Sequence, residues 1–273
     1  MNDRQLLEQH AITPKKSLGQ NFLHDPNTLE KIVAIADLSP DATVLEIGPG
    51  TGNLTRALAG RAARVIAVEV DGRLIPLLQD ATAAFPHVEI VHADILDVNV
   101  GDLVGATPYV VVANLPYYIT SAILRHLLEN TPRPQRLVLT VQREVAERLV
   151  AGPGDMSLLA VSVQFYGQPQ IAMRLNPAAF WPRPDVDSAV VRIDVFDAPR
   201  VAVPDEKAFF RVVRAGFGQK RKQLRNALSA GLGIPKARAV ELLEQAGIDP
   251  QRRAETLSIE EWAALAFAIA QAG

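Results

Sequence analysis

Short apolar runs alternate with stretches of helical periodicity through the first 150 residues of this 273-residue chain. The runs are five to seven residues long and rich in Val and Ile, which is typical of strands buried on both faces. They cover Thr43–Ile47, Arg64–Val70, Val88–His92, Tyr109–Ala113 and Arg136–Val141. A first helix is predicted at Asp25-Pro26, where an N-cap residue precedes proline, and further helices at Leu54–Ala59, Leu74–Ala84, Ile119–Leu128 and Gln142–Val150.

This alternation predicts an α/β fold of the doubly wound class, with a mostly parallel sheet and helices on both of its faces. In such a sheet, ligands bind beyond the carboxyl ends of the strands, at the point where the strand order reverses. Residues that carry chemistry should therefore follow directly after strands.

The pattern changes after Gly152–Asp155, which is predicted to be a loop. Two more strand-like runs, Leu159–Tyr166 and Ser188–Phe196, flank a proline-rich segment from Pro177 to Pro184. Asp197–Pro204 has the composition of a linker, and the remaining sequence is typical of helices and loops. We therefore expect an α/β domain at residues 1–200 and a small all-helical domain at residues 201–273.

Composition excludes several classes of site. The chain contains no cysteine, so disulfides, thiolate metal sites and cysteine nucleophiles are ruled out. The five histidines are scattered without metal-ligand spacing, and we expect no metal. No apolar segment has the length of a signal peptide core or a membrane span, so the prediction is a cytoplasmic protein without a membrane anchor.

The basic residues are concentrated near the C-terminus, although the net charge of the chain is −2. Residues 201–273 carry 11 Lys and Arg against 8 Asp and Glu, and the first 200 residues carry 17 against 22. Lys207 to Arg225 holds seven basic residues and no acidic one. This segment is either a solvated helix face or a phosphate-binding patch that contacts nucleic acid.

The first motif, Glu46-x-Gly48-x-Gly50-x-Gly52, ends the first predicted strand and leads directly into a helix. Glycines permit a sharp turn and a close approach of a ligand to the backbone. The helix N-terminus beyond them offers free N–H groups and partial positive charge. Strand, glycine loop and helix together indicate a site for a nucleoside cofactor.

Acidic residues end the next two predicted strands. Glu69 follows 21 residues after Gly48 and can accept hydrogen bonds from both ribose hydroxyls, whereas a surface acid closing the strand is the simpler alternative. Asp94 ends the third strand, where it is either an acceptor for the adenine amino group of the cofactor or a helix N-cap. The glycine spacing differs from the G-x-G-x-x-G of dinucleotide folds and resembles the first motif of class I (Rossmann-like) methyltransferases. S-adenosyl-L-methionine is thus the expected cofactor, and a dehydrogenase is a distant alternative.

Asn114-Leu115-Pro116-Tyr117 follows the fourth strand and resembles the N-L-P-Y box of methyltransferases that modify amino groups conjugated to a ring. The adenine amino nitrogen is a poor nucleophile, because its lone pair is delocalised into the ring. The Asn114 side-chain carbonyl and the Leu115 backbone carbonyl can accept its two hydrogens and direct the lone pair at a methyl donor. Proline fixes the turn, and Tyr117 can stack on the base. An ordinary Asn-Pro turn is the structural alternative.

Two further boxes complete a family pattern. Lys15-Lys-Ser-Leu-Gly-Gln-Asn21-Phe-Leu23 precedes the first long helix, and Phe180-Trp-Pro-Arg-Pro-Asp-Val-Asp187-Ser-Ala189 follows the predicted sheet. In this order, with the glycine loop and the N-L-P-Y box, they resemble the ribosomal RNA adenine dimethyltransferases over nearly the whole chain. The C-terminal 217–226 stretch is similar to the version of that family that acts on small-subunit rRNA.

The resemblance implies roles for particular residues. Asn21, Leu23 and Gly48 would contact the cofactor, with Glu69 on its ribose, Asp94 on its adenine and Asn114 beside it. Asn114 and Leu115 would hold the target amine, and Tyr117 and Phe180 would sandwich a base flipped out of its stack. Phe180 is alternatively ordinary core packing.

The predicted reaction dimethylates N6 of two adjacent adenosines in a 16S (small-subunit) rRNA hairpin, during assembly of the small ribosomal subunit. The predicted partner is therefore small-subunit rRNA or the immature small subunit, contacted by residues 207–225, and we expect a monomer. The alternatives are a large-subunit rRNA adenine methyltransferase, a DNA adenine methyltransferase, or a ribosome-assembly factor that acts mainly by binding.

Overall fold

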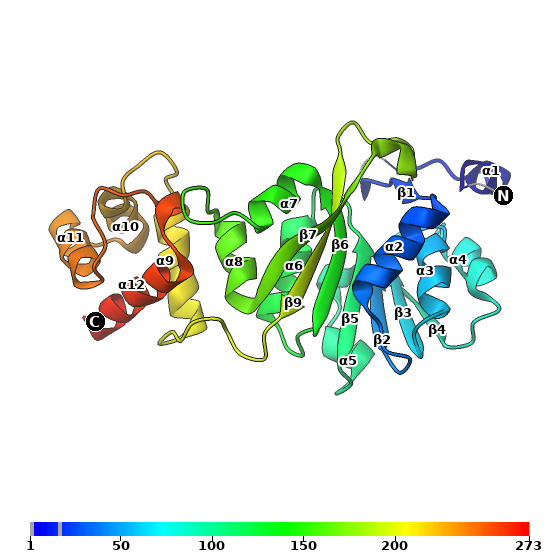
Figure 1. Cartoon of the computed structure of the whole chain (residues 1–273), viewed down its shortest axis with the longest axis horizontal. Coiled ribbons are helices and arrows are strands. Elements are labelled where there is room, and N and C mark those ends of the chain that lie inside the picture. The colour runs from blue at the N-terminus through cyan, green and yellow to red at the C-terminus, as the bar shows by residue number, and fades with distance from the viewer. Residues whose placement is uncertain (1–2, 16–17, 273) are drawn as a thin grey trace. The chain divides into compact units, whose positions relative to one another are not determined.

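The computed structural model of the chain describes residues 3–15 and 18–272, which divide into two compact units (Figure 1). The first unit comprises the described residues up to Ala146 together with Pro169–Val195. The second comprises Glu147–Gln168 and the described residues from Phe196 onward. Each unit thus contains two separate stretches of sequence.

The first unit is built on a seven-stranded sheet in the order β4-β3-β2-β5-β6-β9-β7. Its strands are β2 (Thr43–Ile47), β3 (Arg64–Glu69), β4 (Val88–His92), β5 (Tyr109–Asn114), β6 (Arg136–Gln142), β7 (Gly167–Leu175) and β9 (Ser188–Val195). Strands β2 to β6 pair in parallel, and β9 pairs antiparallel with β6. The five predicted strands are confirmed to within one residue at each end, and so is the α/β class with its mostly parallel sheet.

The strand order reverses at β2, which lies between β3 and β5. Ile47 at the end of β2 is in register with Val68 of β3 and Ala113 of β5, so the three strands end at the same edge. Val44 and Leu45 of β2 have no exposed surface, because helices cover both faces of the sheet. Residues that follow these three strands are therefore held close together.

The helices of this unit are α1 (Asp3–Gln9), α2 (Pro26–Ala36), α3 (Asn53–Ala59), α4 (Ile75–Thr82), α5 (Val100–Val104) and α6 (Thr120–Glu129). The boundary between the units, at Ala146 and Glu147, falls within α7 (Arg143–Leu149). As predicted, Asp25 caps α2: its Oδ2 accepts the Thr28 N–H at 2.9 Å, and proline follows at the first helical position. Right-handed connections place α3 and α6 on opposite faces of the sheet, since the chain moves in opposite directions from β2 and from β5. In the view of Figure 1, α2 lies in front of the sheet and α6 behind it.

The prediction of a strand at Leu159–Tyr166 is wrong, because Leu158–Tyr166 forms helix α8. Ser157 begins it as an N-cap, with its Oγ accepting the Ala160 N–H at 3.1 Å. Nearly every residue of α8 is buried, so the run is apolar on all sides and lacks the periodicity that identifies an amphipathic helix.

Two very short strands, β1 (Phe22–Leu23) and β8 (Phe180–Trp181), form a separate antiparallel pair. Phe22 is opposite Trp181, and Leu23 is opposite Phe180. This pair joins the N-terminal box to the proline-rich box, which are more than 150 residues apart in the sequence. Strands of two residues carry no pattern, so the sequence did not predict this pairing.

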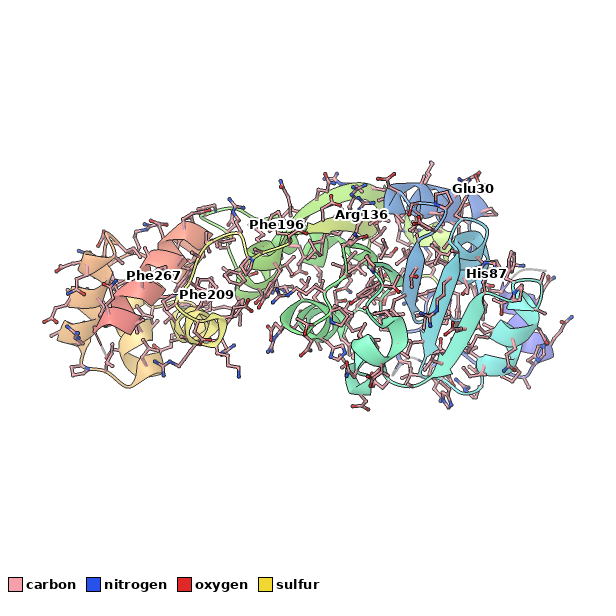
Figure 2. All side chains as sticks on the ribbon, turned by 90° about the horizontal axis from the view of Figure 1, so that it is seen from below. Glu30, His87, Arg136, Phe196, Phe209 and Phe267 are labelled. Carbon is pink, nitrogen blue, oxygen red and sulfur yellow. The ribbon has the colours of Figure 1, made fainter. Side chains whose placement is uncertain are left out.

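The second unit consists of helices around an aromatic core. Besides α8 it contains α9 (Glu206–Phe217), α10 (Leu224–Leu232), α11 (Lys236–Gln245) and α12 (Ile259–Gln271). Phe165 of α8 stacks on Phe209 of α9 with ring centroids 4.7 Å apart, and Phe209 lies among the helices of this unit in Figure 2. Trp262 of α12 is fully buried, with its ring 5.6 Å from that of Phe217. Because α8 contributes to this core, the second unit contains residues that precede strand β9 in the sequence as well as residues that follow it.

Candidate functional site

A pocket opens at the carboxyl ends of β2, β3 and β5, where the sheet topology predicts a ligand. The space between its walls, counted together with its open mouth, is about 750 Å³. Four chain segments line it. They are Leu18–Leu23 of the N-terminal segment, the β2–α3 loop together with Glu46 of β2, Glu69 and Val70 at the end of β3, and Asn114–Tyr117 at the end of β5.

The β2–α3 loop turns at glycines. Gly48 has φ +68°, and its N–H donates to the Val68 carbonyl at 2.9 Å, which fixes the loop to the neighbouring strand β3. Gly50 has φ +60°, and a Cβ there would lie 2.9 Å from the Phe22 ring. A side chain at position 50 would displace Phe22, so the loop needs glycine for both conformation and space.

Glu69 is buried at the end of β3, with a relative exposure of 3%. Its Oε2 accepts the Gly50 N–H at 3.0 Å and its Oε1 accepts the Asp71 N–H at 2.8 Å. Burial raises the pKa of the Glu69 carboxyl, and these two backbone donors partly offset the rise. The carboxylate thus ties the glycine loop to β3 and faces the pocket.

Glu46 lies on β2 and also lines the pocket, although no role was predicted for it beyond its place in the motif. It is 1% exposed, and both of its carboxyl oxygens lack a hydrogen-bond partner among the described residues. Burial raises the pKa of Glu46 to about 8. An acidic residue inside a strand that is otherwise apolar is the sequence signal that could have identified it.

The Asn114–Tyr117 segment forms the wall of the pocket that follows β5. The Asn114 Nδ2 donates to the Asn21 backbone carbonyl at 2.8 Å, which leaves Oδ1 without a hydrogen bond among the described residues. The Leu115 N–H donates to the Thr140 carbonyl of β6 at 3.1 Å, so this part of the loop is held by the sheet. The Tyr117 hydroxyl lies 2.7 Å from Ser188 Oγ, and burial raises the pKa of Tyr117.

The structure brings most of the predicted site residues to this one pocket. They are Asn21, Leu23, Gly48, Glu69, Asn114, Leu115 and Tyr117. Sequence reasoning did not select Gln20 or Ser188, and both make side-chain hydrogen bonds at or beside the pocket. Lys16 and Ser17 of the N-terminal box lie outside the described residues.

Two predicted site residues are not among those that line the pocket. Asp94 is exposed and caps the short 3₁₀ helix Ile95–Asp97, with its Oδ1 accepting the Leu96 N–H at 2.9 Å. Phe180 is 3% exposed and packs in a hydrophobic cluster with residues of α2, α3 and the sheet. In this structure both therefore have the structural role that was the alternative interpretation, and their functional roles stay predictions. Trp181 packs beside Leu74 and Leu77 of another cluster.

No cluster of three or more His, Asp or Glu side chains suited to a metal ion occurs among residues 3–15 and 18–272. Over the same part of the chain, no helix combines the length and apolar character needed to cross a bilayer.

The sequence of the chain is similar to that of known proteins over nearly its whole length. The pattern of the family described as "Ribosomal RNA adenine dimethylase" matches residues 12–271. A protein of Dehalococcoides mccartyi named "Ribosomal RNA small subunit methyltransferase A" is 47% identical over 260 residues, which cover 95% of this chain and 89% of that protein. A Geobacillus kaustophilus protein of the same name is 45% identical over 277 residues, covering 98% and 94% of the two chains.

Solved structures agree over most of the chain. A dimethyladenosine transferase from Plasmodium falciparum superposes with a TM-score of 0.79 and 25% identity, over 92% of this chain and 98% of that one. The 23S rRNA methyltransferase ErmE superposes with a TM-score of 0.72 and 30% identity, over 92% and 100%.

Proposed function

The chain belongs to the ribosomal RNA adenine dimethylase family, and from this membership we propose that it transfers methyl groups from S-adenosylmethionine to N6 of two adjacent adenosines in a hairpin of 16S rRNA. The observation that carries the proposal is the Asn114 amide at the pocket wall, whose nitrogen donates to the Asn21 carbonyl and whose oxygen accepts no hydrogen bond from the described residues. The product is N6,N6-dimethyladenosine.

The pocket fits a nucleoside cofactor that carries positive charge. Glu69 offers a fixed carboxylate beside the glycine loop, where a ribose would be held, and Glu46 adds an unpaired carboxyl group that complements a cation once it is ionised. Leu23 and Gly48, which line the pocket, would contact the cofactor. We further propose that Asp94 holds its adenine. S-adenosylmethionine, when bound, supplies an electrophilic methyl group on a sulfonium.

The chain's own residues prepare the amine for attack. Asn114 Oδ1 and the Leu115 carbonyl accept the two N6 hydrogens, which directs the nitrogen lone pair along the line of transfer. Once methylated, the nitrogen would be acidic, and the same acceptors or water would take its proton. Tyr117, held at its hydroxyl by Ser188, and Phe180 stack on the flipped base.

The choice of small-subunit rRNA rests on relatives and on charge. The curated relatives matched over almost their full length are named as small-subunit methyltransferases. Arg211, Arg214 and the Lys220–Lys222 run lie exposed on the second unit, where they would contact RNA phosphates of the immature subunit. We further propose that the protein works as a monomer in the cytoplasm.

The test supplies labelled S-adenosylmethionine with naked 16S rRNA, immature small subunits, large subunits or DNA, and then maps the labelled base. We expect label on two adjacent adenines of the small-subunit rRNA, and no label on large subunits or DNA. Label confined to large subunits or DNA would contradict the proposal.

Asn114→Ala should lower the rate at least about 100-fold, because the amine loses a positioning acceptor. Asn130→Ala is the matched control. Asn130 is the exposed C-cap residue of α6, and its side chain donates to the His126 carbonyl of that helix. An Asn114→Ala variant that methylates at the wild-type rate would rule out the proposed mechanism. If it loses activity and still supports subunit maturation, the protein has an assembly role separable from catalysis.

A further inference from the structure

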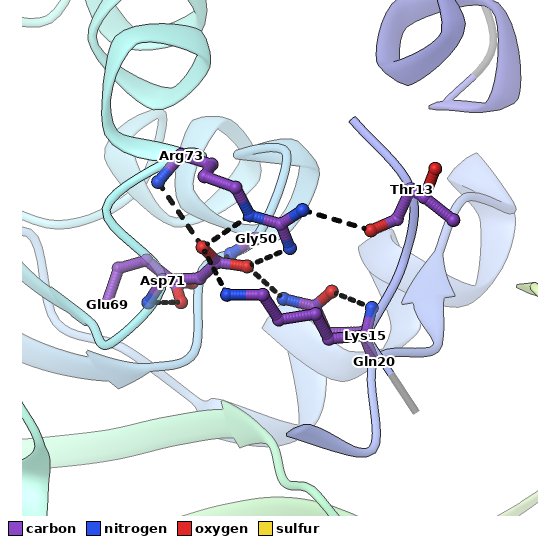
Figure 3. Close-up of polar contacts among 7 residues, drawn as sticks. All are labelled: Thr13, Lys15, Gln20, Gly50, Glu69, Asp71 and Arg73. Atoms are coloured by element: carbon purple, nitrogen blue, oxygen red, sulfur yellow. Dashed lines mark hydrogen bonds and ion pairs between the residues drawn. The ribbon is translucent and has the colours of Figure 1, made fainter. Parts of the chain in front are cut away.

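Asp71, two residues beyond Glu69, has a buried carboxylate with no part in the chemistry described above; its side chain is only 2% exposed. Arg73 donates to both of its oxygens, from Nε to Oδ1 at 2.9 Å and from Nη2 to Oδ2 at 2.6 Å. Gln20 Nε2 donates to Oδ2 at 3.0 Å, and Lys15 Nζ lies 3.6 Å from Oδ1. Figure 3 shows these groups converging on the one carboxylate.

Arg73 alone would satisfy the charge of Asp71, because a two-pronged guanidinium–carboxylate pair is among the strongest polar contacts in proteins. The hydrogen bonds of Arg73 hold the pKa of Asp71 well below its ordinary range. The carboxylate nevertheless receives two further donors from residues more than 50 positions earlier in the sequence. Its contacts therefore do more than neutralise a buried charge, since they bind a distant segment.

That segment, of which residues 13–15 and 18–21 are described, is fastened at several points. Arg73 Nη1 donates to the Thr13 carbonyl at 3.3 Å, and Gln20 Oε1 accepts the Lys15 N–H at 2.7 Å. Gln20 thus uses both ends of its amide, one on Asp71 and the other on its own segment (Figure 3). We call the described residues among 13–21 the strap.

The last residue of the strap, Asn21, contacts the side-chain amide of Asn114. Asn21 directly follows Gln20, and its carbonyl accepts the hydrogen bond from Asn114 Nδ2 at 2.8 Å. This bond holds Nδ2 at the strap, so Oδ1 is the end of the Asn114 amide that stays available to a ligand. If the strap moved away from Asp71, the Asn21 carbonyl would move with it, and the amide would lose the contact that fixes its orientation.

We propose that Asp71 and Gln20 are positioning residues for methyl transfer, which fasten the strap so that the Asn21 carbonyl orients the Asn114 amide toward the target amine. The inference rests on the proposed function, in which Asn114 Oδ1 binds that amine. The backbone N–H of Asp71 also donates to the Glu69 carboxylate. The turn after β3 therefore supports both the strap and Glu69, the residue proposed to hold the ribose of the cofactor.

The experiment compares Gln20→Ala and Asp71→Asn with Glu89→Gln. Glu89 is the matched control, because it forms a similar two-pronged pair with Arg64 on the same unit, on strands β3 and β4 and away from the pocket lining. Single-turnover methylation at saturating S-adenosylmethionine is measured together with cofactor affinity by calorimetry and with thermal unfolding. We expect the rate to fall about 10-fold in each of the two strap variants and to stay unchanged in Glu89→Gln.

A double-mutant cycle separates positioning from a general structural role. In an Asn114→Ala background the amide is gone, so Gln20→Ala should lower the remaining rate less than about 2-fold. Equal losses in both backgrounds would overturn the inference. If Asp71→Asn fails to fold, Gln20→Ala still provides the test, because it leaves the Arg73 pair intact.

The outcomes distinguish this inference from the proposed function. A wild-type protein that neither binds S-adenosylmethionine nor methylates rRNA contradicts the proposed function. An active wild type whose strap variants behave like Glu89→Gln contradicts only the positioning role.

Discussion

The hydroxyl of Tyr117, in the loop after β5, lies 2.7 Å from Oγ of Ser188, the first residue of β9. Ser188 is fully buried, and the contact joins residues 71 positions apart. It holds the Tyr117 ring beside the pocket by its hydroxyl end.

Removing either end of this hydrogen bond should therefore have the same effect. Tyr117→Phe and Ser188→Ala are each expected to lower the methylation rate about 3- to 10-fold, the range set by one net hydrogen bond. The double variant should be no slower than the slower single one, since both remove the same interaction. Full additivity of the two effects, measured by single-turnover kinetics, would show that the residues act independently.

Glu46 should make folding stability depend on pH. Its pKa rises from 4.5 to about 8 on burial, so between these values the folded protein keeps a proton that the unfolded chain has released. The free energy of unfolding therefore falls as pH rises through this window, by up to about 1.4 kcal/mol per pH unit. Glu46→Gln, which cannot ionise, should remove that part of the slope.

Urea unfolding of both proteins at several pH values between about 5 and 8 measures this difference. Groups that do not interact with Glu46 contribute equally to the two curves, so the readout is the change in slope between wild type and variant. That change includes the coupling between Glu46 and Glu69, whose charge raises the pKa of Glu46. Parallel curves would show that Glu46 is ionised in the folded protein throughout this range.

Phe180 can be tested for base stacking with only a small loss of side-chain volume. Phe180→Leu keeps an apolar side chain in the cluster and removes the aromatic face, so it should cost less than about 1.5 kcal/mol of stability. If Phe180 stacks on the base, the same variant lowers the methylation rate about 10-fold. A wild-type rate in a stably folded Leu variant would assign Phe180 to core packing alone.

The basic segment should govern RNA affinity and its salt dependence. Replacing Lys220, Arg221 and Lys222 with Gln is expected to weaken rRNA binding and to reduce the salt slope by about 0.7 to 0.9 for each phosphate that the variant no longer neutralises. Cofactor affinity should not change. Lys236→Gln, on α11 of the same unit, is the control for a general loss of positive charge. An unchanged slope in the triple variant would make this segment a solvated surface.

Much of the pocket could be predicted from the sequence, because residues that follow neighbouring parallel strands come together at one edge of the sheet. Each of β2, β3 and β5 ends at one edge of the sheet, so Gly48, Glu69 and Asn114 had to lie near one another. Two of the residues that were missed, Gln20 and Ser188, make long-range contacts. Gln20 contacts Asp71 and Ser188 contacts Tyr117, and neither pair has a spacing that the sequence reveals.

Helix α8 was missed for a different reason. Its apolar run carries no periodicity because the helix is buried on nearly every side, and nine residues suit a strand as well as a helix. Ser157 was the available signal, as a capping residue directly before the run. The burial of Phe180 depends on the β1–β8 pair, which is too short to leave a pattern.

Strand β9 lies between β6 and β7 in the sheet, although β7 precedes it in the chain. Synthesis runs from the N-terminus, so the outer edge of β6 has no partner until residues 188–195 have left the ribosome. Every residue that lines the pocket has been made by Tyr117, long before that edge is covered. A nascent chain that stops between these points carries a complete pocket lining beside an open strand edge, and such edges recruit other chains. Truncated products of this protein should therefore aggregate through β6, and protection of the nascent chain matters most between residues 142 and 195.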